Sequence, residues 1–408
     1  MAGYDFLRGI RVLELAQLGP SSLGGYLADM GAEVIKIEGQ QGDPNRDSGT
    51  PAIGSPTGTS FLHLRWNRGK KSLGLDLRQP EGKAIFRRLA QSADIVIEGM
   101  KAGALERLGL GYEVLRTGNP RLVFCSLSGL GSSGPYAEFG SHGPYFDAFA
   151  GLSRLNPYAL TPEQRASTDW TAIGMHAMGL YAALGVLAAL SQAQRTGAGA
   201  AVEVSGAEAA AHWLPEGVNK ALNPHLLHDR EGFLNSRRKQ ACWPRLYCYA
   251  TADDKQLYFQ ALKPKFWERF CESIGRPDLI QRYVASDDLG ETDEAVHAEL
   301  REIIGSRPLA EWVECCRRWE VPVGPANSPA ELVEDPHFLA RDNIYEVDQP
   351  GVGPMRLTGT PVKTPGQDFA PASAPDLWHN TAELLTDLLG ISAEEQQALR
   401  ERGVVFGE

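Results

Sequence analysis

The segment IRVLELAQLGPSSLGGYLADMGAEVIKIE, residues 10–38, contains the alternation of elements that decides the fold. It begins with a strand-like apolar run at residues 10–15 and ends with another at residues 33–38. Between them, residues 20–30 carry helix signals, with a proline at the start and Gly31 just past the end. Because strands joined by a helix lie parallel in one sheet, this segment predicts a β-α-β unit.

The same alternation continues through the first half of the chain. Strands separated by helices form parallel sheets with both faces covered, so we expect an α/β fold with a Rossmann-like parallel sheet. The further strand-like runs are residues 73–77, 94–98, 122–127 and 201–205, and the helical runs are residues 81–92 and the long Ala/Gly-rich stretch 170–194.

A second, smaller domain is predicted after residue 245. A hairpin-like pair of runs, residues 246–249 and 257–261, precedes three helical stretches that end near residue 319. This pattern is typical of an α+β domain. The expected division is a large domain of residues 1–220 completed by 345–408, a linker or active-site loop at 221–245, and a small domain at 246–344.

The composition is that of a soluble globular protein, with 408 residues, 43% hydrophobic and 22% charged. A net charge of −11 argues against nucleic acid or an anionic membrane as the main partner, but not against a phosphorylated small molecule. The six cysteines form no C-x-x-C pair, which predicts reduced thiols, a cytoplasmic location and no metal site. Glycines and His176 interrupt the run 170–194, so we expect a packed internal helix rather than a membrane span.

Asp169 is the strongest candidate for a catalytic group. It stands at the head of the long run 170–194, where free backbone N–H groups and the helix dipole would keep a carboxylate ionised. An ionised carboxylate can act as a nucleophile in acyl transfer. The ordinary alternative is a simple N-cap, because aspartate is a preferred capping residue.

Other candidate ligand-binding residues lie in loops. Gln17 begins a loop between a strand and a helix that could present amides to a phosphate, although it lacks the G-x-G-x-x-G pattern of dinucleotide binding. Lys70 and Lys71 belong to a basic stretch, residues 65–72, that could hold phosphates or be a solvated loop. Arg107 is a possible phosphate contact or a surface charge, and His142 a possible base or a solvated loop residue.

Taken together, several ordered segments resemble the class III CoA-transferases, a family that includes formyl-CoA, carnitine and benzylsuccinate CoA-transferases and the related α-methylacyl-CoA racemases. The resemblance covers nearly the whole chain. It is carried by LRGIRVLEL at residues 7–15, GAEVIKIE at 31–38, KKSLGLDL at 70–77, GALERLG at 103–109, RTGAG at 195–199 and VPVGPAN at 321–327.

The resemblance implies roles for individual residues. It places Asp169 on the family's nucleophilic aspartate and puts Gly99 and Met100 in a loop used against the nucleotide of CoA. It also implies that CoA and acyl-CoA are substrates rather than permanently bound cofactors, that a carboxylic acid is the second substrate, and that the chain forms an interlocked homodimer. The further residues it places along the path of CoA are Gln17, Lys70, Lys71 and Arg107.

Two departures from the family pattern leave alternatives open. Residues 237–245, RRKQACWPR, stand where some members have a glycine-rich loop that closes over the acyl group, and Arg237, Arg238 and Arg245 could instead hold an acidic acyl group. His142 falls near the position of the racemases' catalytic histidine. We therefore expect an acyl-CoA:carboxylate CoA-transferase, with an α-methylacyl-CoA racemase using His142 and Asp169 as the alternative.

Overall fold

The structure, a computed structural model, describes residues 3–47, 59–151, 173–213, 215–226, 243–283 and 294–408. The chain divides into two compact units, one of Met1–Val218 with Asp342–Glu408 and the other of Asn219–Arg341. Each unit has its own hydrophobic core and is described by itself. Asp169, Arg237, Arg238 and Cys242 lie outside the described residues.

The first unit is built on a seven-stranded sheet with the order β12-β3-β2-β1-β4-β5-β6. Strand β12 is antiparallel to β3, and the other strands run parallel. The order 3-2-1-4-5-6 is that of the Rossmann fold, so the expected α/β class with a mostly parallel sheet is confirmed. The strands are β1 (Arg11–Ala16), β2 (Glu33–Glu38), β3 (Lys71–Leu75), β4 (Ile95–Gly99), β5 (Val123–Ser128), β6 (Ala201–Ser205) and β12 (Val405–Phe406).

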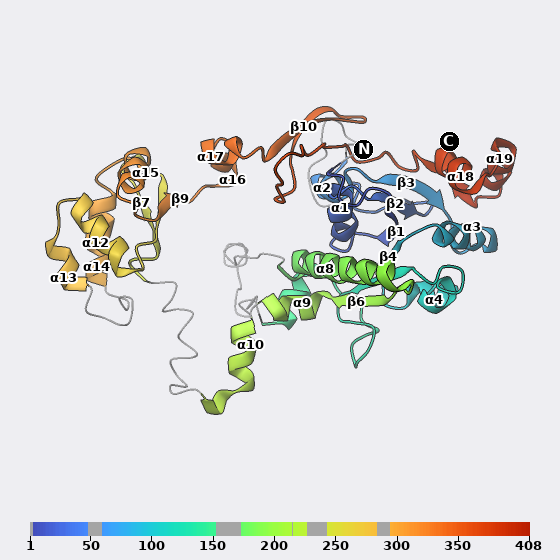
Figure 1. Ribbon diagram of the computed structural model, residues 1–408, viewed down its shortest axis with the longest axis horizontal. Helices are drawn as coiled ribbons and strands as arrows, with labels where there is room; N and C mark the ends of the chain where they lie inside the picture. The colour runs from blue at the N-terminus through green and yellow to red at the C-terminus, as the bar shows by residue number, and fades with distance from the viewer. Residues whose placement is uncertain (1–2, 48–58, 152–172, 214, 227–242, 284–293) are drawn as a thin grey trace, which may run out of the picture. The chain divides into compact units, whose positions relative to one another are not determined.

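Alternating side chains of the sheet feed two separate cores. In β1, Leu13 and Leu15 belong to one core, whereas Val12 and Ala16 belong to the other, because successive side chains of a strand point to opposite faces. Helices cover both faces (Figure 1). The first core includes α3 (Pro80–Gln91), α18 (Thr381–Leu389) and α19 (Ala393–Glu401); the second includes α1 (Ser21–Asp29), α8 (Ile173–Thr196) and α9 (Gly206–Trp213).

Helix α8 has the length and composition of a membrane span, with 24 residues and a mean hydropathy of 1.7 over its most apolar window. It nevertheless packs against α1, α9, β5 and β6 (Figure 1). Small residues permit this close contact: a Cβ added at Gly179 would lie 2.0 Å from Ser22 Oγ. The Ala/Gly-rich sequence therefore serves helix packing in the second core.

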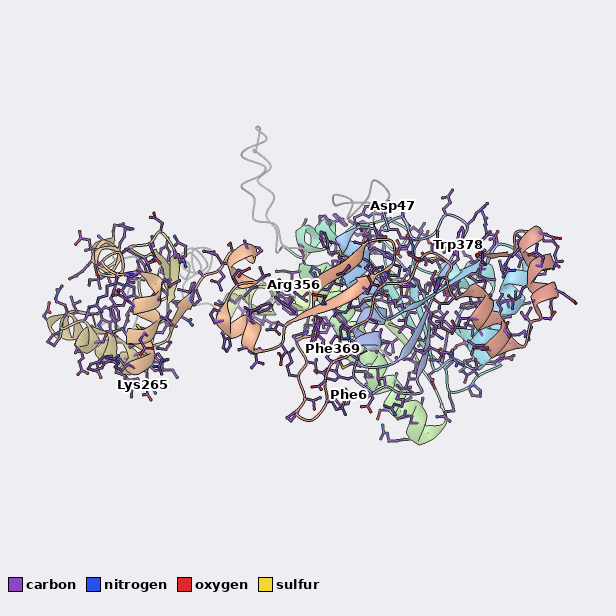
Figure 2. All side chains as sticks on the ribbon, turned by 90° about the horizontal axis from the view of Figure 1, so that it is seen from above. Phe6, Asp47, Lys265, Arg356, Phe369 and Trp378 are labelled. Atoms are coloured by element: carbon purple, nitrogen blue, oxygen red, sulfur yellow. The ribbon has the colours of Figure 1, made fainter. Side chains whose placement is uncertain are left out.

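The C-terminal segment completes the first unit. Gly3 pairs with Ala370, and the Phe369 ring lies 5.5 Å from that of Tyr4. Trp378, labelled with Phe369 in Figure 2, packs against Phe406 of β12 at a ring distance of 5.2 Å. The remaining elements are α2 (Phe61–Asn67), α4 (Ala104–Leu108), α5 (Tyr112–Leu115), α6 (Gly143–Phe149), and the hairpin β10 (Ile344–Gln349) and β11 (Gly353–Thr358).

The second unit has the expected hairpin and helices. Strands β7 (Tyr247–Ala250) and β8 (Gln256–Phe259) pair antiparallel, and β9 (Val323–Pro325), which the sequence did not predict, joins β8. An aromatic core fixes the helices on this sheet, with Phe259 and Phe270 rings 4.6 Å apart. The helices are α10 (Pro215–Leu222), which begins within the first unit, then α12 (Pro264–Ser273), α13 (Asp278–Tyr283), α14 (Glu294–Ile304), α15 (Leu309–Arg318), α16 (Pro329–Leu332) and α17 (Pro336–Ala340).

Candidate active site

A cavity of about 270 Å³ lies where the strand order of the large sheet reverses. Residues 17–20, which follow β1, and residues 99–102, which follow β4, form two of its walls. The loop after β5 and Met175 of α8 form others. Open α/β sheets bind ligands at this position, because the loops from adjacent strands diverge there. Four residues named from the sequence meet in this cavity: Gln17, Gly99, Met100 and His142.

Buried contacts set the path of the loop that carries Gln17. The carbonyl oxygen of Ala16 accepts hydrogen bonds from Lys36 Nζ at 2.5 Å and from Ser21 Oγ at 2.8 Å. The neighbouring loop approaches so closely that a Cβ at Gly99 would lie 2.4 Å from Pro20 Cβ. Glycine is therefore required at the point where the two loops meet.

Lys70 lies inside the protein beneath the first turn of α1. Its ammonium is 2.8 and 2.7 Å from the two carboxylate oxygens of Glu14, 2.9 Å from Ser21 O and 3.1 Å from Asn67 Oδ1. Both side chains of the ion pair are fully buried. Burial lowers the pKa of Lys70 to about 8, against the opposing effect of Glu14. With four acceptor atoms from three residues already around the ammonium, this geometry favours a structural role over contact with CoA.

Lys71 and Arg107 do not line the cavity that contains Gln17. Lys71 begins β3 at the amino edge of the sheet, where its ammonium pairs with Glu33 at 3.2 Å and Glu383 at 2.7 Å. Arg107 is exposed, donates to Ala102 O at 2.9 Å, and lines a separate cavity of about 550 Å³ with Glu203. Contact of either residue with CoA stays a prediction.

A third cavity, of about 390 Å³, extends over the carboxyl ends of β1, β2 and β3. It shares the lining residues Gln17 and Met100 with the cavity of 270 Å³. Glu38, which imitates the ribose-binding acid of dinucleotide folds, lies here but is already paired with Arg46 at 2.7 Å and Ser72 Oγ at 2.6 Å. Burial alone would raise the pKa of Glu38, and Arg46 and Lys36 overcome that effect and hold it below its usual range.

Asp147, which follows the cavity-lining Phe146, was not singled out as functional by the sequence analysis. It is fully buried in α6, and its carboxylate accepts hydrogen bonds from Ile173 N at 3.0 Å and Gly174 N at 2.7 Å. Asp147 thus caps the first described turn of α8, the role considered for Asp169 as a simple N-cap. The only sequence signal was an acidic residue two positions before the end of a short, otherwise uncharged helical stretch, which is not specific.

Of the three arginines in the segment of residues 237–245, the structure describes Arg245. Arg245 is buried, with its guanidinium carbon 5.9 Å from the centre of the Trp267 ring. Burial lowers its pKa. Where the structure describes the chain, it holds no group of three or more side chains suited to a metal ion, and Cys125, Cys248, Cys271, Cys315 and Cys316 are free thiols.

The sequence matches the family model described as CoA-transferase family III over residues 7–380. The chain belongs to this family. Class III CoA-transferases similar to it include the succinyl-CoA–L-malate CoA-transferase alpha subunit of Chloroflexus aurantiacus, 34% identical over 98% of this chain and 92% of the relative. The succinate–glutarate CoA-transferase of Agrobacterium fabrum is 32% identical over 94% and 95%.

Solved structures agree with this assignment. A CAIB/BAIF family protein from Brucella suis is 26% identical to this class III CoA-transferase and superimposes with a TM-score of 0.75, covering 94% of this chain and 100% of that one. The expected family and enzyme class are therefore confirmed, and the cavity at the strand reversal lies in a CoA-transferase.

Proposed function

We propose that the protein transfers CoA from an acyl-CoA to a carboxylic acid, with Asp169 as the nucleophile. The observation that carries this proposal is the position of the cavity beside the start of α8, whose Met175 and Met178 line it. Asp169 is four residues before Ile173, and four residues span at most about 14 Å. The proposal requires its carboxylate to reach a thioester bound in the cavity next to Gln17.

The proposed reaction exchanges one activated acyl bond for another in four steps. The Asp169 carboxylate attacks the thioester carbonyl of the donor, the C–S bond breaks, and CoA thiolate and a mixed anhydride form. The thiolate attacks the aspartyl carbonyl of the anhydride, giving an aspartyl-CoA thioester and the free donor acid. The acceptor carboxylate displaces the thiolate to form a second anhydride. The thiolate then attacks the acceptor carbonyl, giving the new acyl-CoA and regenerating the aspartate.

The described residues supply binding and exclusion of water for this chemistry. The cavity walls from Leu18, Met100, Leu127, Phe146 and Met178 are apolar, so they lower the access of water to the anhydride. Gly129 and Leu130 follow β5 in the same cavity and are candidates to donate backbone N–H groups to the developing oxyanion. Confinement of the free thiolate beside the anhydride favours its return over its loss.

We further propose a dicarboxylic acid as one substrate, because the similar relatives are named for succinyl-CoA, malate and glutarate. Pairing of two copies of the chain, in the proposed interlocked homodimer, is supported by exposed apolar side chains on α8 and α9 of the first unit. Leu184 is 68% exposed and Trp213 is 48% exposed. A surface of this kind is more typical of a protein interface than of a monomer. A cytoplasmic location fits the free thiols.

A direct test combines an acid screen with substitution of the nucleophile. The enzyme is incubated with succinyl-CoA and a panel of carboxylic acids, and new thioesters are identified by mass spectrometry. We expect Asp169→Ala to lower kcat by more than about a thousandfold, while the matched surface variant Asp5→Ala retains full activity. Hydroxylamine added with acyl-CoA should inactivate the wild-type enzyme by modification of Asp169. Retention of activity by Asp169→Ala would exclude the nucleophile.

Racemisation is the second candidate function, because His142 lies in the same cavity as Gln17. A racemase exchanges the α-proton of one acyl-CoA and needs no second acid. In D2O, the proposed transferase incorporates no deuterium at the α-position. Given an isotopically labelled free acid, it exchanges that label into the CoA ester. Uptake of α-deuterium, abolished in His142→Ala, would instead establish the racemase.

A further inference from the structure

Residues 99–103 form a loop that belongs to three cavities at once. Met100 lines the cavities of about 390 and 270 Å³, and Ala102 lines the cavities of about 270 and 550 Å³. The loop connects the end of β4 to the short helix α4. The loop therefore borders the cavity surfaces next to both Gln17 and Arg107.

A buried carboxylate, Glu98, holds both ends of this loop. Glu98 is 1% exposed and lies on β4, paired with Leu15 of β1 and Ser126 of β5. Its Oε1 accepts a hydrogen bond from Leu105 N at 2.7 Å, in the first turn of α4. Its Oε2 accepts one from Ser126 Oγ at 3.2 Å. One side chain thus ties the loop's far end back to the strand from which the loop departs.

The electrostatic setting of Glu98 is unfavourable for its charge. Burial raises the pKa of its carboxyl, the amides of Leu105 and Ala104 and the hydroxyl of Ser126 oppose that rise, and Glu106 of α4 adds repulsion. The neighbouring residue of β1 is Leu15, which carries no charge. A buried acid in this setting becomes protonated at a higher pH than an exposed one, and a protonated carboxyl accepts hydrogen bonds more weakly.

We propose that Glu98 is a positioning residue for CoA: its ionised carboxylate fixes the loop of residues 99–103 and thereby sets the affinity for CoA, which falls as the carboxylate is protonated. The inference rests on the proposed function, because it takes CoA as the ligand of this edge of the sheet. Glu98 itself touches no substrate. Its effect is exerted through Met100 and its neighbours in the loop.

The test measures CoA binding by calorimetry between pH 5.5 and 8.5 for the wild type, Glu98→Gln and the exposed control Glu113→Gln. We expect Glu98→Gln to bind CoA about 10-fold more weakly at pH 8. The difference from the wild type should shrink as the pH falls toward 5.5, because burial raises the pKa of the wild-type carboxyl and its protonated fraction grows. CoA phosphates also titrate near pH 6, but that effect is common to all three proteins. In steady state, KM for CoA ester should rise while kcat stays within about twofold.

Equal CoA affinity and equal pH dependence in Glu98→Gln and the wild type would overturn the inference. If Glu98→Gln does not fold, Ser126→Ala, which removes one of the two contacts, decides the question. It should weaken CoA binding about threefold at pH 8, and unchanged binding counts against the inference. Failure of the wild type to bind or transfer CoA would refute the proposed function instead, so the two outcomes are distinguishable.

Discussion

Replacement of Lys70 by methionine separates a structural role for this residue from a role in binding CoA. Methionine has a similar length and no charge, so the substitution removes the ion pair with Glu14 without opening a large cavity. Among the residues that the structure describes, Glu14 would keep Lys36 Nζ at 3.3 Å and Ser21 Oγ at 3.2 Å. Breaking a buried pair costs about 3–5 kcal/mol, and these remaining contacts place the expected loss near the lower end, about 3 kcal/mol.

Urea and thermal denaturation measure this loss. At roughly 2–4 °C per kcal/mol for a domain of this size, Tm should fall by roughly 6–12 °C. The adjacent Lys71→Met is the matched control, because its ion pairs are partly exposed and should contribute only about 0–1 kcal/mol. In the double variant Lys70→Met/Glu14→Gln, the loss should be smaller than the sum of the single losses, since no unpaired carboxylate remains.

The reasoning fails if Lys70→Met melts within about 2 °C of the wild type. If that variant also raised KM for the CoA ester by about tenfold or more, the Lys70 ammonium would be a ligand contact. The sequence-based assignment to the path of CoA would then be correct. Normal KM with a lowered Tm is the outcome that the buried contacts predict.

Two further predictions follow from other buried groups. Burial, with Arg46 and Lys36, lowers the pKa of His63 to about 3, so its ring is neutral when folded and protonated below about pH 6.5 when unfolded. The contribution of His63 to stability is therefore fully present above pH 6.5 and is lost as the pH falls. Because of this residue, urea denaturation should give a free energy of unfolding about 2 kcal/mol lower at pH 5 than at pH 7.5. An equal dependence of that free energy on pH in His63→Gln and the wild type would contradict the prediction. Asp147→Ala should lower the free energy of unfolding by about 1–2 kcal/mol through loss of a helix cap, and should lower kcat about tenfold by releasing the first described turn of α8. Asp147→Asn, whose amide oxygen can still accept a hydrogen bond, should retain most of the stability and most of the kcat. Unchanged kcat in Asp147→Ala would show that these hydrogen bonds do not influence catalysis.

The sheet and its helices were predictable because they depend on local periodicity. The run of residues 33–38 was expected as a strand and is β2, and the expected helix of residues 81–92 is close to α3. The short strands were not predictable: β9 has three residues and β12 has two. Such short segments acquire strand conformation only through the partner strand that they pair with.

For the site, the sequence motifs assigned Gln17, Gly99 and Met100 to the binding of CoA. The structure brings the three to one edge of the sheet, because loops after parallel strands share its carboxyl end, and their contact with CoA stays a prediction. The sequence could not distinguish Lys70 from Lys71. The two are adjacent in sequence, yet one ammonium meets Glu14 in the interior and the other meets Glu383 at the surface. Neighbouring residues at a strand point to opposite sides, and the register that selects the buried side depends on the other strands.

The amino-acid sequence alone thus determined the α/β class, the alternation of strands and longer helices in the first half of the chain, and membership of the family, since each of these is carried by local patterns or by ordered motifs. The tertiary structure alone decided which charged groups are paired with one another in the interior and which face the cavity. Glu14 and Lys70 are 56 residues apart, and Asp147 accepts a hydrogen bond from the backbone N–H of Ile173, 26 residues later. The pairing of such groups depends on how the chain folds back on itself, which no local pattern encodes.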